Sequence, residues 1–414
     1  MEIHSANSRR MKRMKKLFAL LLTLAMVLSL AACGGNSGGS DGGSGSGVSG
    51  SKVIKIGIYE PSSGANGAGG KKEVLGIEYA NTQVSTVTIG GEEYSIELVP
   101  VDNQSENDKG VSAAQQLVSS GVAVVLGSYG SGVSMAAAPV FEEAKIAAIG
   151  CSCTNPGVTL GNPYYFRVCY LDPFQGSVLA NLARDEFSAE TAYVFTELGD
   201  DYSVGLGEYF TQECDRLGIK VVADQNPQGN TDMSGFVNGA KSAGADVIFA
   251  PCSTTVASLL IDQAASAGIP LIAGDTWDDA VILQAASKSK ADVYFSTFYD
   301  EGASDDAAAF MEGFKAWLNA NSDKLSNNGG SDTVSAVSAL GYDAYMVAVE
   351  AIKAANSADS DAIAQALSGV TYTGVTGDVV FDDDGDVDKN IIFIKGVDTE
   401  KGEFYSVKEQ GLDQ

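Results

Sequence analysis

The chain has 414 residues, more than one hydrophobic core usually holds, so two lobes are expected. Acidic residues outnumber basic ones by 53 to 26, and the formal net charge of −27 argues against nucleic acid or an anionic membrane surface as a partner. The single histidine, His4, lies in a segment that we expect to be removed. This excludes a Ser-His-Asp or Cys-His nucleophile and a histidine zinc site, and we predict no cofactor and no bound metal.

The first 32 residues have the three parts of a secretory signal peptide. Basic residues between positions 9 and 16 precede the apolar run LFALLLTLAMVLSL at residues 17–30, and Ala31-Ala32-Cys33 follow. As a helix this run rises only about 21 Å, less than the roughly 30 Å of a bilayer's hydrocarbon core. It matches a lipobox, which predicts cleavage before Cys33 and lipid attachment to that thiol. The protein is then extracytoplasmic and anchored to the outer face of a bacterial plasma membrane. Met11 and Met14 are alternatives to Met1 as the start.

Residues 33–51 are predicted to be the lipidated cysteine and a tether. The sequence GGNSGGSDGGSGSGVSGS after Cys33 has too little apolar surface to fold. A random coil of this length reaches about 23 Å. The folded part that begins at Lys52 is therefore expected to stay close to the membrane and to turn freely.

From residue 52 onward, short β-branched runs alternate with segments of helical spacing. Buried parallel strands are predicted at residues 53–59, 96–101, 122–126, 146–149, 192–195, 220–223, 247–249, 271–273 and 293–295. Helices are predicted at residues 112–118, 135–144, 205–217, 233–242 and 256–267, with ends at Gly218 and Gly268. This alternation predicts an α/β fold with two Rossmann-like lobes built on parallel sheets.

Ligands of such sheets bind beyond the carboxyl ends of the strands. In the first half, the loops after the predicted strands (residues 60–70, 127–134 and 150–156) are rich in glycine and hydroxyl groups. Their free backbone N–H groups and the adjoining helix N-termini suit a carboxylate, although tight turns and helix caps would explain the same residues. A phosphate-binding GxxxxGK[ST] motif is absent.

In the second half, the corresponding loops carry acids and aromatic residues, at positions 197–203, 251–255 and 274–279. A carboxylate site that faces acids and aromatics is what a zwitterion such as an amino acid needs. Asp275 is the main candidate for the ammonium partner, with helix capping as the alternative.

Seven segments carry a further signal in their order and spacing: IKIGIYEPSSG, VVLGSYGSGVS, PVFEEAKIAAIGCSCTNP, YYFRVCYLDPFQG, DDYSVGLGEYF, AGIPLIAGDTWDD and GDVVFDDDGDVDKNIIF. Together they resemble the extracytoplasmic solute-binding proteins of ABC transporters for branched-chain and other aliphatic amino acids, the type I periplasmic binding proteins. The resemblance implies two lobes joined by three crossovers that close on the ligand. We assign residues 52–171 plus 298–375 to the N-terminal lobe and residues 172–297 plus 376–414 to the C-terminal lobe.

The resemblance also implies roles for individual residues. Ser131 and Thr154, with backbone N–H groups near Ser152, would hold the ligand carboxylate. Tyr202 and Asp275 would hold the ammonium group. Tyr129 and Ser253 would line the side-chain end of the ligand. The partners implied are a small aliphatic amino acid and the permease subunits of the transporter.

Three departures from the family pattern leave the ligand open. Ser253 stands where an aromatic residue is frequent, and Ser152 and Cys153 replace small apolar residues. An amide or urea binder of the same family is therefore an alternative, and so is a ligand sensor for a membrane receptor. An enzyme would have to use carboxylates such as Asp275 and Asp278, and we predict a binding protein instead.

Three further features have structural interpretations. The acids between Asp382 and Asp388 do not follow a calcium-loop pattern. The family resemblance implies instead a β-hairpin with Gly385 at its turn. Residues 172–176 are expected at a hinge. The cysteines after Cys33 are an odd five, predicted to be buried free thiols, with one disulfide as the alternative.

Overall fold

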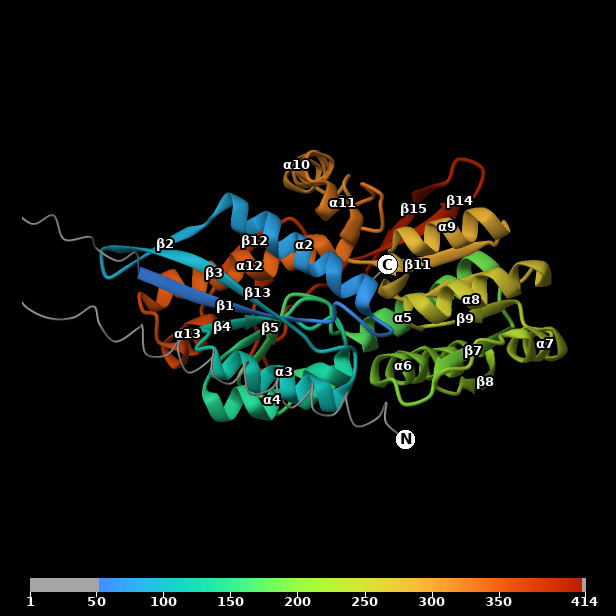
Figure 1. Cartoon of the computed structure of the whole chain (residues 1–414). Coiled ribbons are helices and arrows are strands. Elements are labelled where there is room, and N and C mark those ends of the chain that lie inside the picture. Colours follow the sequence, from blue (N-terminus) through green and yellow to red (C-terminus); the bar gives the residue numbers. More distant parts are fainter. Residues whose placement is uncertain (1–51, 412–414) are drawn as a thin grey trace, which may run out of the picture. The chain divides into compact units, whose positions relative to one another are not determined.

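The structure is a computed structural model that describes residues 52–411. The predicted signal peptide, Cys33 and the tether lie outside these residues. The described part contains a six-stranded sheet, a seven-stranded sheet and a small two-stranded sheet (Figure 1). Within it, no helix combines the length and the apolar character needed to cross a bilayer.

The six-stranded sheet has the order β2-β3-β1-β4-β5-β6, and only β2 runs antiparallel to its neighbour. Its strands are β1 (Lys52–Glu60), β2 (Thr86–Ile89), β3 (Glu92–Asp102), β4 (Val124–Leu126), β5 (Ala148–Gly150) and β6 (Tyr165–Arg167). The helices packed with it are α2 (Gly67–Gln83), α3 (Asn107–Ser119), α4 (Ser131–Ala144), α10 (Asp305–Ala320), α11 (Ser322–Asn327), α12 (Ala336–Ala355) and α13 (Ser360–Leu367).

Alternate side chains of β1 enter different cores, as the twofold period of a strand requires. Ile54, Ile56 and Ile58 pack in the cluster that includes residues of α2 and α12. Tyr59 instead packs with α3 and α4 on the opposite face. Figure 1 shows these two helix pairs on opposite sides of the sheet. The sheet is therefore covered on both faces.

The seven-stranded sheet has the order β15-β14-β11-β10-β9-β7-β8. Its strands are β7 (Thr191–Glu197), β8 (Lys220–Asn226), β9 (Val247–Phe249), β10 (Leu271–Ala273), β11 (Val293–Thr297), β14 (Ile392–Asp398) and β15 (Glu403–Gln410). The segments beside it are α5 (Asp172–Phe187), α6 (Asp201–Leu217), α7 (Ser234–Ala243), α8 (Thr254–Ala264), η2 (Ala265–Ala267), η3 (Asp275–Trp277) and α9 (Ala280–Ser289). One face packs on α5 and α6, where Phe210 stacks on Phe249 with ring centroids 3.9 Å apart.

The predicted α/β fold with two Rossmann-like lobes is confirmed, and each predicted strand and helix overlaps an observed one. Two strands are less buried than predicted. Strand β8 is exposed along much of its length because it forms an edge of its sheet. Strand β3 is only partly buried because its outer neighbour is the short edge strand β2. The helices that were not predicted are α2, α5, α9, α10, α11, α12 and α13. Helix α12 lacks an amphipathic pattern because it is apolar nearly all round, and 14 of its 20 residues are buried.

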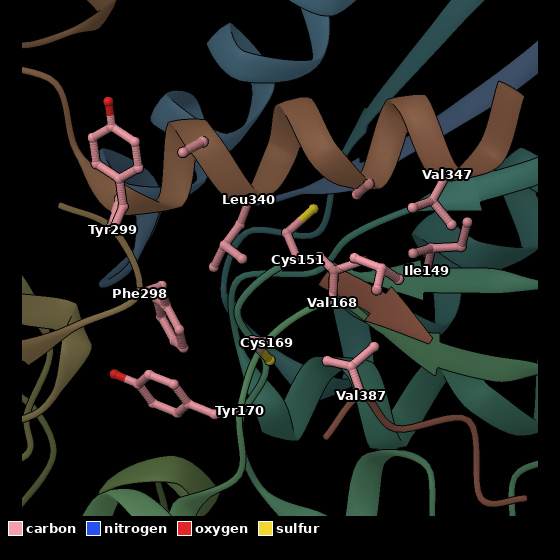
Figure 2. Packing of buried hydrophobic residues seen from close by; sticks show 14 of the residues in the cluster. Ile149, Cys151, Val168, Cys169, Tyr170, Phe298, Tyr299, Leu340, Val347 and Val387 are labelled. Atoms are coloured by element: carbon pink, nitrogen blue, oxygen red, sulfur yellow. The ribbon is translucent and has the colours of Figure 1, made fainter. Parts of the chain in front are cut away.

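The chain passes between the two sheets three times. The first two passages follow β6 and β11, where Tyr170 and Phe298 pack with ring centroids 4.1 Å apart (Figure 2). The third precedes β14. Strands β12 (Thr371–Gly374) and β13 (Gly377–Val380) pair with each other before it. The turn after β13 still contacts the first sheet, because the backbone N–H of Arg167 on β6 donates to the Gly385 carbonyl at 3.1 Å. We therefore propose that the third crossover lies between Val387 and Ile392. The lobe boundaries stay a prediction.

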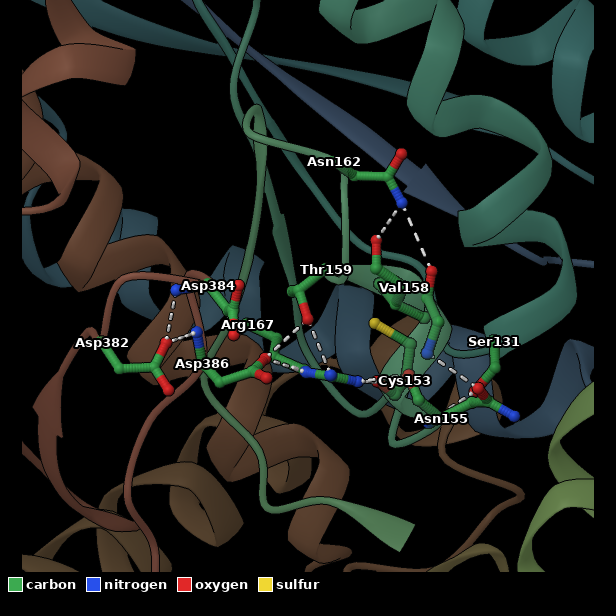
Figure 3. A network of polar contacts seen from close by, with 11 residues as sticks. Ser131, Cys153, Asn155, Val158, Thr159, Asn162, Arg167, Asp382, Asp384 and Asp386 are labelled. Carbon is green, nitrogen blue, oxygen red and sulfur yellow. Dashed lines mark hydrogen bonds and ion pairs between the residues drawn. The ribbon is translucent and has the colours of Figure 1, made fainter.

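The acidic segment that begins at Asp382 forms a hairpin turn, as predicted. Asp382 Oδ1 accepts the backbone N–H groups of Asp384 and Asp386, both at 2.9 Å, and Gly385 has the positive φ of +83°. The Asp386 carboxylate accepts a hydrogen bond from Arg167 Nε, which links the turn to β6, as Figure 3 shows. The acids therefore order a turn and hold an arginine.

All five cysteines after Cys33 are buried free thiols, as predicted, which excludes the single disulfide. Their residues are Cys151, Cys153, Cys169, Cys214 and Cys252. Figure 2 shows Cys151 and Cys169 among apolar side chains next to α12. Burial raises the pKa of each thiol, so all five remain neutral.

Candidate functional site

A small cavity lies between loops of the two lobes at the carboxyl ends of their strands. It is lined by Asn66, Tyr129, Gly130, Ser152, Asp200, Tyr202, Ser253, Asp275 and Thr276. Five of the seven predicted ligand residues are among these, while Ser131 and Thr154 are buried close by without lining the cavity. The space measures about 10 Å³. That is roughly the room one water needs, so an amino acid can enter only after the lobes move apart.

The second lobe contributes a buried carboxylate. Asp275 is 2% exposed, and its Oδ1 accepts a hydrogen bond from the Tyr202 hydroxyl at 3.0 Å. Burial raises the pKa of Asp275 to about 7, because the charged form has lost water without gaining a cation. A ligand ammonium group would supply that cation.

Helix capping does not explain Asp275. The segment η3 begins at Asp275, and its N-cap is Gly274, without a side-chain cap. Asp279 instead caps the N-terminus of α9, because its Oδ1 accepts the Val281 N–H at 2.8 Å. The capping alternative for Asp275 is therefore wrong.

Gln175 holds Asp275 in place and was not predicted as a site residue. Its Oε1 accepts the Asp275 N–H at 3.0 Å and the Ser296 hydroxyl at 2.6 Å, and its Nε2 donates to Asp172 at 3.2 Å. Both Gln175 and Asp172 lie in the first turn of α5, at the first crossover. The segment at residues 172–176 thus holds the backbone of the residue that carries the carboxylate, and its role as a hinge stays a prediction.

The first lobe presents a helix N-terminus to the cavity. Helix α4 begins at Ser131 after Gly130, which supplies no side-chain cap. The Ser131 hydroxyl accepts the Asn155 N–H at 3.3 Å, and the Thr154 hydroxyl has no hydrogen-bond partner among residues 52–411. Uncapped N–H groups at a helix N-terminus favour an anion such as a carboxylate.

Arg167 fixes the loop that carries Ser152 and Thr154. Its Nη1 donates to the carbonyls of Cys153 and Asn155, at 2.8 and 2.6 Å, on both sides of Thr154 (Figure 3). The side chain is fully buried, and its remaining nitrogens contact Asp386 and Thr159. The position of the loop with Ser152 and Thr154 therefore depends on Arg167.

The two lobes also contact each other directly. Lys72 on α2 forms an ion pair with Asp279, and the two side chains are only 2% and 3% exposed. Asn155 donates to the Asp201 carbonyl at 3.0 Å. These contacts, together with the small cavity, describe a closed arrangement.

Four residues that line the cavity were not predicted individually, although each lies in a predicted ligand loop: Asn66, Gly130, Asp200 and Thr276. Four buried charged residues behind the lining were not predicted either: Glu60, Lys72, Glu73 and Asp279. A signal for Glu73 existed, because Gly76, Ile77 and Ala80 follow it at helical spacing and place it on the apolar face of α2. The glycine-rich segment before it obscured the start of that helix, which lies at Gly67.

Two lobes that enclose a polar cavity at their strand ends define a solute-binding protein of the type I periplasmic class. The periplasmic binding protein family matches residues 53–402, and the chain belongs to this family. It is 29% identical, over 80% of its length and 87% of the relative's, to Leu/Ile/Val-binding protein homolog 1 of Brucella abortus.

Solved structures agree with this assignment. A leucine-binding protein, LivK, of Thermotoga maritima is 30% identical, with a TM-score of 0.78 over 87% of this chain and 99% of the other. LivJ of Streptococcus pneumoniae, in complex with isoleucine, is 26% identical, with a TM-score of 0.76 over 87% and 99% of the two chains. These relatives are solute-binding proteins, which confirms the prediction that the chain is not an enzyme.

Proposed function

We propose that this protein captures a branched-chain or other small aliphatic amino acid between its lobes and delivers it to the permease of an ABC transporter. The observation that carries the proposal is the pairing, across one cavity, of a buried carboxylate with an uncapped helix N-terminus. The likeness to the leucine-binding protein LivK and to LivJ with isoleucine supports an aliphatic ligand.

The site residues take the following roles in this proposal. Ser131, Thr154 and the backbone near Ser152 bind the ligand carboxylate. Tyr202 and Asp275 bind its ammonium group. Tyr129 and Ser253 face its side chain, and Ser253 also caps α8 by accepting the Val256 N–H at 3.4 Å. The lobes open to admit the ligand and close over it, so the ligand shifts the population toward the closed arrangement.

A thermal-shift screen tests the ligand class. We expect L-leucine, L-isoleucine, L-valine or a close aliphatic relative, at about 100 times its dissociation constant, to stabilise the folded protein by about 2.7 kcal/mol. Aliphatic amides, urea and benzoate belong in the same screen. If only the uncharged amides or urea stabilise the protein, it is an amide binder and Asp275 has no ammonium partner.

We also propose that the protein is a lipoprotein, anchored through Cys33 outside the plasma membrane. The lipobox and the Gly/Ser-rich segment after it support this. Replacing the cysteine (Cys33→Ala) should abolish incorporation of labelled lipid and move the protein from the membrane fraction to the medium, or leave it unprocessed. If the wild-type chain is itself found unlipidated and free in the medium, the anchor assignment is wrong.

A further inference from the structure

Two glutamates lie behind the first-lobe wall of the cavity. Glu60 is the last residue of β1, and Glu73 lies on α2. They are 2% and 0% exposed, and their carboxylate oxygens lie within 4.8 Å of each other and of the Cys151 sulfur. Two buried carboxylates this close together need a cation or a proton to offset their negative charge.

Each carboxylate makes one hydrogen bond to a residue that lines the cavity. Glu60 Oε2 accepts the Tyr129 N–H at 2.8 Å, and Glu73 Oε1 accepts the Ser152 hydroxyl. The second oxygens, Glu60 Oε1 and Glu73 Oε2, are buried and have no partner among residues 52–411. Carboxylate oxygens within 4.8 Å of each other repel one another, whereas one proton shared by the two groups makes one a donor and the other an acceptor.

We propose that Glu60 and Glu73 form a proton-binding pair that couples capture of a carboxylate ligand to proton uptake. One proton is bound to Glu60 Oε1, which donates it in a hydrogen bond to Glu73 Oε2. A second, taken from solvent as the lobes close, binds Glu73 Oε1. The protonated oxygen then donates to the Ser152 oxygen, which frees the Ser152 hydrogen to donate to the ligand carboxylate. The inference rests on the proposed function and adds a chemical requirement to it.

The groups around the pair bring no positive charge. Tyr59 precedes Glu60, Tyr129 follows β4, Cys151 and Cys153 follow β5, and Tyr165 lies on β6; burial raises the pKa of each, so all are neutral. Asp275 approaches from the second lobe and adds negative charge. Lys72, next to Glu73 in sequence, is paired with Asp279.

These surroundings favour protons on the pair. Burial, followed by repulsion from Glu73, raises the pKa of Glu60 well above its ordinary value. Burial raises the pKa of Glu73 to about 7.

The sign of the pH effect follows from closure. When the lobes part, water reaches Ser152 and the pair, which lowers the pKa of Glu73 toward its ordinary value. The closed state therefore binds more protons than the open state. Affinity for a carboxylate ligand is full at low pH, falls by up to about tenfold per pH unit between the ordinary pKa of a carboxyl group and a pKa of about 7, and is constant at its low value above that range.

Calorimetry with L-isoleucine as the probe tests the coupling. Titrations between pH 5 and 8, in pairs of buffers with different ionisation enthalpies, count the protons taken up. We expect Glu73→Gln to take up fewer protons than the wild type, by up to about one per ligand, and to lose the corresponding pH dependence. The Glu78→Gln variant, one and a half turns along α2, is the matched control and should behave as the wild type. Asp275 contributes with the opposite sign, because an ammonium partner makes it release a proton.

A second measurement needs no ligand. Infrared spectra at pH 7 should contain a C=O band of a protonated buried carboxyl group that is missing in Glu60→Gln. Circular dichroism checks that both variants fold. If no amino acid binds at any pH, the proposed function fails, and the infrared band still tests the pair.

Three results would overturn the inference: equal proton uptake by the wild type and Glu73→Gln, an infrared band unchanged in Glu60→Gln, or stoichiometric binding of a divalent metal ion that is lost in both variants.

Discussion

Asp275→Asn should weaken amino acid binding by more than about tenfold while leaving the fold intact. The substitution keeps the shape of the side chain and its contacts with Tyr202 and Gln175 but removes the charge that a ligand ammonium group would meet. Truncating one partner of a buried charge pair typically costs about 2 to 5 kcal/mol. Calorimetric titration with L-leucine and L-isoleucine measures the loss.

A matched control is available on the same lobe. Asp262 is exposed and pairs with Lys288 at 3.0 Å, away from the cavity. Asp262→Asn should leave ligand affinity unchanged, because an exposed pair contributes little and does not touch the site. Equal binding by the wild type and Asp275→Asn would place the ammonium site elsewhere in the cleft.

The sequence predicts the strand positions well because buried parallel strands are short β-branched runs with glycine or polar residues at their ends. The same logic brings Tyr129, Ser152, Tyr202, Ser253 and Asp275 to one cavity, because each follows a strand and the carboxyl ends of parallel strands share an edge. Ser131 and Thr154 come from the same loops but lie beside the cavity. Loop order alone could not distinguish lining residues from their buried neighbours.

The buried charges were harder to predict. Lys72 and Glu73 directly follow the glycine-rich loop at residues 60–70, for which only a ligand-binding role was predicted. Both are buried because α2 packs against α12 and its N-terminal end faces the other lobe. Gln175 was missed for a related reason. Its partner Asp275 lies 100 residues away, and an uncharged side chain carries no signal of a contact at that distance.

Arg167→Met should destabilise the protein by about 3 to 5 kcal/mol, the range for removing one member of a buried ion pair. Arg167 is fully buried and its partner Asp386 is only 8% exposed, so the variant leaves a carboxylate without a cation in a place that water hardly reaches. It also leaves the carbonyls of Cys153 and Asn155 without their donor. Urea unfolding followed by circular dichroism measures the change.

Arg216→Met is the matched control, because Arg216 is exposed and pairs with Glu213 within one helix turn. Loss of the Arg216 ion pair should change the free energy of unfolding by less than about 0.5 kcal/mol.

A double variant separates two causes of the loss of stability in Arg167→Met. If the loss comes mainly from the unpaired Asp386 carboxylate, Arg167→Met combined with Asp386→Asn should recover part of the stability. If it comes mainly from the loop carbonyls, the double variant should be as unstable as Arg167→Met, and amino acid affinity should fall in both, because Ser152 and Thr154 lie on that loop. Equal stability of Arg167→Met and the wild type would show that the buried pair and the loop contacts do not support the fold.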